Sequence, residues 1–275
     1  VTAQDQLDMM HTMQQAPMRV NNKAYDALMT VMDKHRGEAL LMMNADVTEE
    51  QLAAEHFSDR HSVQSSADGL LRELGTMMDF VGTLKKDSTG KREAFFDSIY
   101  GAKNSRMHYA SNMINFQLSK IHRAMVDYEN FETVVDISGL DTQNWYNEDG
   151  TTSELGFVMR GIMEQAEGTE KLMEKALEGS AFTQGFTVDK LPSEAVLDHF
   201  YKYVTTDAQV ISAVASMDKL LNQSNKFTSE DMSNITELVK FWEGDVGSFR
   251  VLMELTNLLN AQKNGDKTVT TSIGV

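Results

Sequence analysis

The chain of 275 residues has no cysteine and only two prolines, Pro17 and Pro192. The absence of cysteine excludes disulfides, thiolate metal sites and thiol nucleophiles together. The scarcity of proline removes the strongest helix breaker from nearly the whole sequence. The 19 methionines are flexible and unbranched side chains that fill irregular gaps in helical cores. These biases favour long helices.

Long apolar runs are missing as well. The richest run, Ala39–Met43, is far shorter than the ~18 residues that a membrane span needs. The opening residues, VTAQDQLDMMH, do not combine a basic start with an apolar stretch, so no signal peptide is recognisable. We therefore expect a soluble protein of the cytoplasm or of a virion, with no membrane span.

Basic residues are few relative to acidic ones. The 41 Asp and Glu outnumber the 25 Lys and Arg and give a formal net charge of −16. A field of this sign repels nucleic acid and anionic membranes. The composition therefore predicts protein partners or self-association, and no nucleic acid.

Helical periodicity is strongest in the first half of the chain. Over residues 61–86, apolar positions alternate steps of four and three, which is typical of a coiled-coil-like seam. A second periodic segment covers residues 91–130. Because such a seam must face another helix, we predict an antiparallel helical hairpin with a turn at residues 87–90. The residues expected to be buried against one another are Leu70, Leu74, Met77, Val81, Ile114, Leu118, Ile121 and Met125.

Further helices are expected along the rest of the chain. Capping boxes that begin at Thr48, Thr151 and Thr206 mark three of their starts. We predict a mainly α-helical fold: a long-helix bundle with coiled-coil-like antiparallel helical hairpins and at most a small β element. Periodic apolar positions place additional helices at residues 22–44, 155–179, 210–221, 232–242 and 249–259.

Three segments are β-prone: residues 131–138, 181–190 and 268–275. The last of them is terminal, so we expect it to be loose or to bind a neighbour by strand addition. The predicted organisation is an N-terminal helical region with the long hairpin at 1–130, a polar connecting loop at 131–150, and a C-terminal helical region with a β-prone tail at 151–275.

The stretch LKKDSTGKRE (residues 84–93) contains part of a nucleotide-binding pattern. A phosphate-binding loop needs Gly, four residues and then Gly-Lys-Ser/Thr, and it follows a buried strand. Here Lys85 stands in the place of the first glycine, Arg92 follows Lys91, and the preceding segment is a predicted helix. We therefore predict a turn between two helices, with no nucleotide or other cofactor.

Two segments carry metal-ligand residue types. If Gly150 takes the sixth position of a calcium loop, Trp145 stands first and Gly156 twelfth, and neither supplies a ligand side chain. His56 and His61 are five residues apart and do not share a helical face. The sequence therefore predicts no metal site, and a solvated loop before a helix at residues 141–156.

No catalytic set is recognisable. The chain has no Gly-x-Ser-x-Gly motif, and His108 and His122 lie fourteen residues apart on the predicted helix, too far for a shared proton relay. We predict a protein that is not an enzyme, and we expect no small-molecule ligand. Aromatic residues in polar or bent segments either anchor partners or fold back onto the core. The candidates for such partner contacts are Trp145, Tyr146 and Trp242.

These observations favour a non-enzymatic helical structural or interaction protein, a component of a larger assembly. A processed virion protein, internal to the capsid of a large tailed phage, fits this hypothesis; the start at Val1 then reflects either maturation or a trimmed chain. One alternative is an acidic inhibitor or decoy that binds a basic nucleic-acid-binding protein, although the acids are interleaved with Lys and Arg. Another is a helical-bundle carrier that holds an apolar ligand among its methionines.

Overall fold

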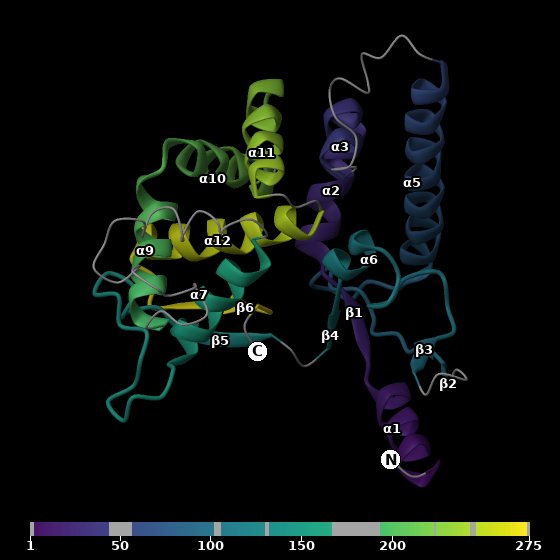
Figure 1. Cartoon of the computed structure of the whole chain (residues 1–275), viewed down its shortest axis with the longest axis horizontal. Coiled ribbons are helices and arrows are strands. Elements are labelled where there is room, and N and C mark those ends of the chain that lie inside the picture. Colours follow the sequence, from purple (N-terminus) through teal and green to yellow (C-terminus); the bar gives the residue numbers. More distant parts are fainter. Residues whose placement is uncertain are drawn as a thin grey trace. The chain divides into compact units, whose positions relative to one another are not determined.

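The computed structural model describes residues 3–43, 57–101, 106–129, 132–166, 193–222, 224–242 and 246–273. These residues form ten helices and six short strands, so the fold is mainly α, as predicted (Figure 1). The strands pair antiparallel in three two-stranded sheets. By its internal contacts the chain divides into two compact units. The first unit comprises residues 1–33 and 46–131, and the second comprises residues 34–45 and 132–275.

The first unit combines helices with two small sheets. Its longest helix is α5, which Figure 1 shows in dark blue. Strand β1 pairs with β4, and β2 pairs with β3. The elements are α1 (Ala3–Gln15), β1 (Met18–Val20), α2 (Asn22–Lys34), α5 (Phe57–Thr83), β2 (Ile99–Gly101), β3 (Met107–Tyr109), α6 (Lys120–Met125) and β4 (Val126–Tyr128).

The predicted helix over residues 91–130 is wrong. Between α5 and α6 the described residues form turns and the strands β2 and β3. Phe95 exchanges two backbone hydrogen bonds of 2.8 Å with Met18, so a segment far away in sequence pairs with the backbone here. Because this long-range pairing satisfies the backbone groups, the apolar periodicity does not lead to a helix, and the long helical hairpin does not form.

In the first unit, the residues that were predicted to be buried agree with the structure better than the predicted helices do. Apolar side chains must leave water whichever element carries them, so their burial does not depend on a correct helix assignment. Six of the eight residues predicted to be buried are at most 3% exposed, and the other two are half-buried. The buried ones are Leu74, Met77, Val81, Ile114, Ile121 and Met125, and the half-buried ones are Leu70 and Leu118.

The second unit is a group of helices with one sheet. Helix α10 packs against α11 and α12, while α7 contacts α9 and α12 (Figure 1). Helix α12 is the most deeply buried, because six apolar side chains between Phe249 and Leu258 are each at most 1% exposed. The elements are α3 (Arg36–Met43), β5 (Thr133–Asp136), α7 (Glu154–Gln165), α9 (Ser193–Thr206), α10 (Ala208–Leu221), α11 (Ser229–Phe241), α12 (Val246–Asn264) and β6 (Thr268–Thr271).

Strand β5 confirms the predicted β element at residues 131–138, and β6 pairs with it in antiparallel register. The tail is therefore attached within its own unit, and the prediction of a loose arm is wrong. Two buried charged residues of α12 hold it there: Arg250 Nη2 donates to Ser272 Oγ (2.5 Å), and Glu254 Oε2 accepts from the Thr271 hydroxyl (3.0 Å). The β-prone segment 181–190 lies outside the described residues.

Two predicted helix starts are displaced by one or two residues. Ser153, rather than Thr151, caps α7, and its Oγ accepts a hydrogen bond from the backbone N–H of Gly156 (3.1 Å). Asp207, rather than Thr206, caps α10. A reciprocal capping box occurs at α11, where Thr228 and Asp231 bond each other's backbone N–H groups. The predicted box at Thr48 lies outside the described residues.

Candidate functional site

One segment of the first unit has the opposite charge balance to the whole chain. Residues 94–126 contain a single acidic residue, Asp97, although the chain has 41 in total. Its basic side chains are Lys103, Arg106, Lys120 and Arg123. We call residues 94–126 the acid-poor segment. An anionic partner meets less repulsion here than along the rest of the chain.

The one acid of the segment is used internally. Asp97 is half-buried, and its Oδ1 accepts from the backbone N–H of Ser111 (3.0 Å), while its Oδ2 accepts from Asn115 Nδ2 (3.4 Å). Asn115 is itself 1% exposed, and its Oδ1 accepts from the N–H groups of Gln117 and Leu118. These bonds fold the loop between β3 and α6 and direct the carboxylate inward.

The ribbon formed by β2 and β3 has one buried face. Successive side chains of a strand point to opposite faces, so the opposed pair Ile99 and Tyr109 shares one face, and Tyr100 and His108 share the other. Ile99 and Tyr109 are both at most 9% exposed. The Tyr109 and Tyr128 hydroxyls lie 3.1 Å apart, and burial raises the pKa of Tyr109. The inner face therefore fixes the ribbon to the first unit through β4.

The outer face of the ribbon carries the ring of Tyr100, which is open to solvent, beside the half-buried His108. Tyr100 is 51% exposed and stacks on His108, with ring centroids 5.6 Å apart and planes 30° from parallel. Phe96 and Met113 of the same segment are 62% and 45% exposed. Exposed rings beside basic residues can stack on planar groups while the cations attract negative charge.

Side-chain amides secure the edges of the ribbon. Gln117 Oε1 accepts from the N–H of Tyr109 (2.9 Å), and its Nε2 donates to the carbonyl of Met107 (2.7 Å). On the other strand, Gln14 Nε2 of α1 donates to the carbonyl of Ile99 (3.1 Å). The N–H of Tyr109 and the carbonyls of Met107 and Ile99 are thus paired, and the Tyr100–His108 pair is held on a supported ribbon.

A buried histidine lies at the end of the acid-poor segment. His122 Nε2 is 3.0 Å from Glu73 Oε1 of α5, and the Ser119 hydroxyl donates to the same carboxylate. Desolvation lowers the pKa of His122, while the Glu73 carboxylate acts in the opposite direction. Together these contacts join α6 to α5. The prediction that His108 and His122 share one helix is wrong, because His108 lies on β3.

The stretch LKKDSTGKRE forms a tight β-hairpin just before the acid-poor segment. Lys86 pairs with Arg92, and Gly90 takes a φ of +82°, which favours glycine. Asp87 Oδ1 accepts from the N–H (2.8 Å) and the hydroxyl (2.7 Å) of Thr89. The predicted turn is confirmed, but a strand-like segment follows it where a helix was expected.

Arg92 anchors this hairpin on α2. The residue is 7% exposed, and its Nη1 donates to Asn22 Oδ1 (2.5 Å). Its guanidinium lies 4.8 Å from the ring centroid of Tyr25, and its Nη2 is 3.6 Å from Asp26 Oδ1. The neighbouring Lys85 and Lys86, in contrast, are exposed. The hairpin therefore exposes Lys85 and Lys86, while Arg92 attaches it to α2.

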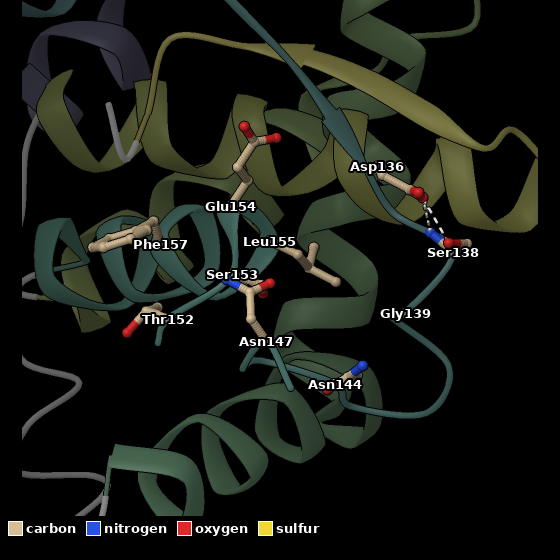
Figure 2. Close-up of a pocket in the computed structure, with 10 residues that line it drawn as sticks. All are labelled: Asp136, Ser138, Gly139, Asn144, Asn147, Thr152, Ser153, Glu154, Leu155 and Phe157. Carbon is tan, nitrogen blue, oxygen red and sulfur yellow. Dashed lines mark hydrogen bonds between the residues drawn. The ribbon is translucent and has the colours of Figure 1, made fainter. Parts of the chain in front are cut away.

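The second unit has a polar pocket with a volume of about 490 Å³. Figure 2 shows it bordered by the end of β5, the following loop and the start of α7. Its lining includes the carboxylates Asp136 and Glu154 and the amides Asn144 and Asn147, and none of the residues that line it is basic. Asp136 bonds the N–H and hydroxyl of Ser138, and these bonds lower its pKa. The lining disfavours anionic ligands.

The two segments that carry metal-ligand residue types differ in how far the structure describes them. Within the described residues, no group of three or more His, Asp or Glu side chains is placed to hold a metal ion. The loop aligned with a calcium site forms a second hairpin turn at residues 146–152. His56 and the side chain of His61 lie outside the described part of the chain.

The two tryptophans fold back onto the core, which is one of the two alternatives stated for them from the sequence. Both are 0% exposed. Trp145 Nε1 donates to Asp198 Oδ1 (2.7 Å), and Trp242 Nε1 donates to the Tyr203 hydroxyl (3.0 Å). A large apolar ring with one polar group is buried most favourably when that group finds a partner. Tyr146 is half-buried, and a partner-binding role for it stays a prediction.

Sequence reasoning missed the exposed rings of Phe96 and Tyr100. The reason is that both were assigned to an amphipathic helix, where aromatic residues at such spacing belong to a buried stripe. The signal that could have identified the segment is the local charge: 33 consecutive residues hold one acid in a chain of net charge −16.

The comparisons with known proteins concern the same part of the chain. A family model described as "Virion DNA-directed RNA polymerase domain" matches residues 5–126. The match includes the hairpin at residues 84–93 and the acid-poor segment, and it ends before the residues that line the pocket. No curated protein matches the chain. The match supports the predicted association with a virion. No helix in the described part of the chain is long and apolar enough to cross a membrane.

The same match overturns the prediction that nucleic acid is not a partner. That prediction used the net charge of the entire chain, which says nothing about its distribution. The first unit has 17 acidic and 12 basic residues, whereas the second has 24 and 13. Within the first unit the acids are further depleted over residues 94–126, so the local field differs from the average.

Proposed function

We propose that the chain is part of a virion-associated DNA-directed RNA polymerase and that its first unit binds nucleic acid. The observation that carries the proposal is the position of the acid-poor segment within the part that matches the polymerase family. In this proposal the second unit, which is more acidic, contacts other proteins of the assembly.

Electrostatics supports this assignment of roles. The phosphate backbone supplies most of the affinity in sequence-independent binding, and Lys and Arg side chains provide the contacts. Arg123 on α6 is exposed, as are Lys85 and Lys86 on the hairpin. The one acid between residues 94 and 126 is folded inward by Ser111 and Asn115. A phosphate chain along the acid-poor segment therefore meets cations and little opposing charge.

The kind of contact available supports a positioning role for the first unit. Cations on a fixed hairpin and exposed rings on a supported ribbon hold a nucleic acid without reading its sequence. We propose that the first unit positions nucleic acid and that it does not itself catalyse nucleotide addition. Phosphate contacts of this kind fix the register of the bound strand.

The proposal is tested by fluorescence anisotropy with labelled 20-nucleotide DNA and RNA strands. We expect binding at about 50 mM salt and an affinity about tenfold lower at about 200 mM, because counterions are released on binding. The double variant Arg106→Gln with Arg123→Gln should bind more weakly and reduce the slope of log affinity against log salt by roughly one to two.

The matched control removes two exposed cations from the second unit, Lys202→Gln with Lys263→Gln. It makes the same change in net charge, and we expect wild-type affinity and an unchanged salt slope. If the wild-type chain binds neither strand at low salt, or if the two double variants lose affinity equally, the assignment of nucleic-acid binding to the first unit is wrong.

A further inference from the structure

We infer that the outer face of the β2–β3 ribbon binds single-stranded nucleic acid by stacking an unpaired base on Tyr100. The inference rests on the proposed function and adds to it the form of the nucleic acid and the residue that contacts a base. The observation behind it is the exposed ring of Tyr100, stacked on the half-buried His108, inside the acid-poor segment.

The arrangement of the two rings favours stacking. His108 lies against one side of the Tyr100 ring at 30° from parallel, so a base on the opposite side would extend an existing stack. The buried pair Ile99 and Tyr109 and the amide of Gln117 hold the strands that carry these rings. A supported ring loses little conformational freedom when a ligand stacks on it, which favours affinity.

A single strand fits this face better than a duplex. The bases of a duplex are stacked on one another and do not present open faces, whereas those of a single strand do. Phe96, which is 62% exposed in the same segment, provides a second ring of the kind that single-strand-binding proteins use. Arg106 directly precedes β3 and is exposed, so a cation accompanies the rings along the chain.

Charge decides between nucleic acid and a peptide as the occupant of this face. An exposed tyrosine ring alone would serve a protein partner as well. The 33-residue segment around it, however, has four Lys and Arg and one acid, which is turned inward. This balance complements a polyanion, and the open rings complement its unpaired bases.

The test compares wild type and Tyr100→Leu on three labelled probes: a 15-nucleotide oligothymidine, the same strand with abasic sites at its centre, and a 15-base-pair duplex. We expect Tyr100→Leu to bind the oligothymidine about tenfold more weakly, with an unchanged salt slope, because stacking does not release counterions. Both proteins should bind the abasic strand equally, since it has no base to stack. Tyr100→Phe should retain wild-type affinity.

Phe157→Leu is the matched control, because Phe157 is also 51% exposed but lies on α7 of the second unit. It should bind all probes like wild type. Circular dichroism of each variant checks the fold. Should Tyr100→Leu misfold, Tyr100→Trp gives a second readout: the fluorescence of the new indole should be quenched by oligothymidine and not by the abasic strand.

The outcomes separate the two proposals. If wild type binds none of the probes at low salt, the proposed function fails and the inference fails with it. If wild type binds but Tyr100→Leu binds oligothymidine equally well, or the indole at position 100 is not quenched, the inference alone is wrong. Tighter binding of the duplex than of the single strand also overturns the inference and leaves the proposed function standing.

Discussion

Two hairpin turns of this chain share a backbone design and differ in charge. One spans residues 86–92 and the other residues 146–152. Their glycines, Gly90 and Gly150, have φ values of +82° and +81°. In each turn the residue three positions before the glycine accepts from the glycine N–H, at 3.0 and 2.9 Å. The same residue donates to the carbonyl of the residue after the glycine, at 2.9 and 2.8 Å.

The two turns differ in their charged residues and in the element that follows each of them. The first reads KDSTGKR, lies in the part that matches the polymerase family, and leads into a strand-like segment. The second reads YNEDGTT, lies outside that match, and leads into α7. Turn geometry is therefore a local property of Asp, Asn and Gly at fixed positions. The buried contacts of the flanking residues decide which element comes next.

The largest effect is expected for Gly156→Ala, which tests how the second turn packs against the start of α7. A Cβ at this position of α7 would lie 2.3 Å from the Trp145 carbonyl oxygen and 2.9 Å from Thr152 Cγ2. Because the backbone must move to relieve the overlap, we expect a loss of about 2–4 kcal/mol in the free energy of unfolding. Urea denaturation followed by circular dichroism measures it.

Gly75→Ala in α5 is the control for that substitution. Its Cβ would meet nothing within 4 Å, and alanine favours a helix by about 1 kcal/mol over glycine. We therefore expect it to be neutral or stabilising. A cost below about 0.5 kcal/mol for Gly156→Ala would show that the second turn and α7 are not packed as described.

The anchor of the first turn is tested by Arg92→Leu. The substitution removes the bond to Asn22 and the interactions with Tyr25 and Asp26, and we expect it to cost about 2 kcal/mol of unfolding free energy. Lys86→Leu, on the paired and exposed position, should stay within about 0.5 kcal/mol. If the two substitutions cost the same free energy of unfolding, Arg92 does not anchor the first turn. Thermal and urea unfolding provide the measurement.

The shared geometry of the turns predicts equal glycine effects. Gly90→Ala and Gly150→Ala each place a side chain in the left-handed region, with nothing else within 4 Å of the new Cβ. We expect each to cost about 1 kcal/mol, and the two costs to agree. A difference of more than about 1 kcal/mol between them in urea unfolding would show that the two turns are not equivalent.

The smallest effect concerns the two turn aspartates. Hydrogen bonds from the hydroxyl and then the N–H of a threonine two residues later lower the pKa of Asp87 (from Thr89) and of Asp149 (from Thr151). Since the folded pKa is depressed, these bonds are complete above the ordinary pKa of aspartate and are lost as the pH falls through the depressed value. Carboxyl NMR titration should show both aspartates titrating below 3.8.

Thr89→Val and Thr151→Val provide the check on that cause. Each substitution keeps a branched side chain and removes the hydroxyl that bonds the carboxylate. The pKa of the aspartate in the same turn should rise toward its ordinary value, and the pKa of the other aspartate should not move. A titration in which neither variant changes its own aspartate would contradict the role of the hydroxyl.

The two turns also show how far the sequence predicts the fold. After the second turn, Leu155, Met159 and Ile162 recur at helical spacing and Ser153 is available as a cap, so the predicted helix forms. After the first, the helical spacing of apolar residues is equally visible, yet Phe95 pairs with Met18, more than seventy residues earlier. The local periodicity of apolar residues cannot reveal such a pairing, because the pairing depends on tertiary contacts.

The charge balance of the candidate site could be predicted from the sequence, but the arrangement of its side chains could not. A count of acids over residues 94–126 shows the local reversal of charge from the printed sequence alone. The stack of Tyr100 on His108 depends on the register of β2 against β3, which brings residues eight apart face to face. On a helix, residues eight apart lie more than two turns from each other, so a helix prediction separates them.

The most direct measurement of the central claim is photo-cross-linking of the full chain to a single strand that contains 5-iodouracil, followed by peptide mapping. We predict that the cross-linked peptides come from residues 94–126, with Tyr100 among the modified residues, and that about 1 M salt abolishes the cross-links because it displaces the phosphate contacts. Cross-links that map mainly to residues 132–275, or that persist at the same yield in high salt, would contradict the account.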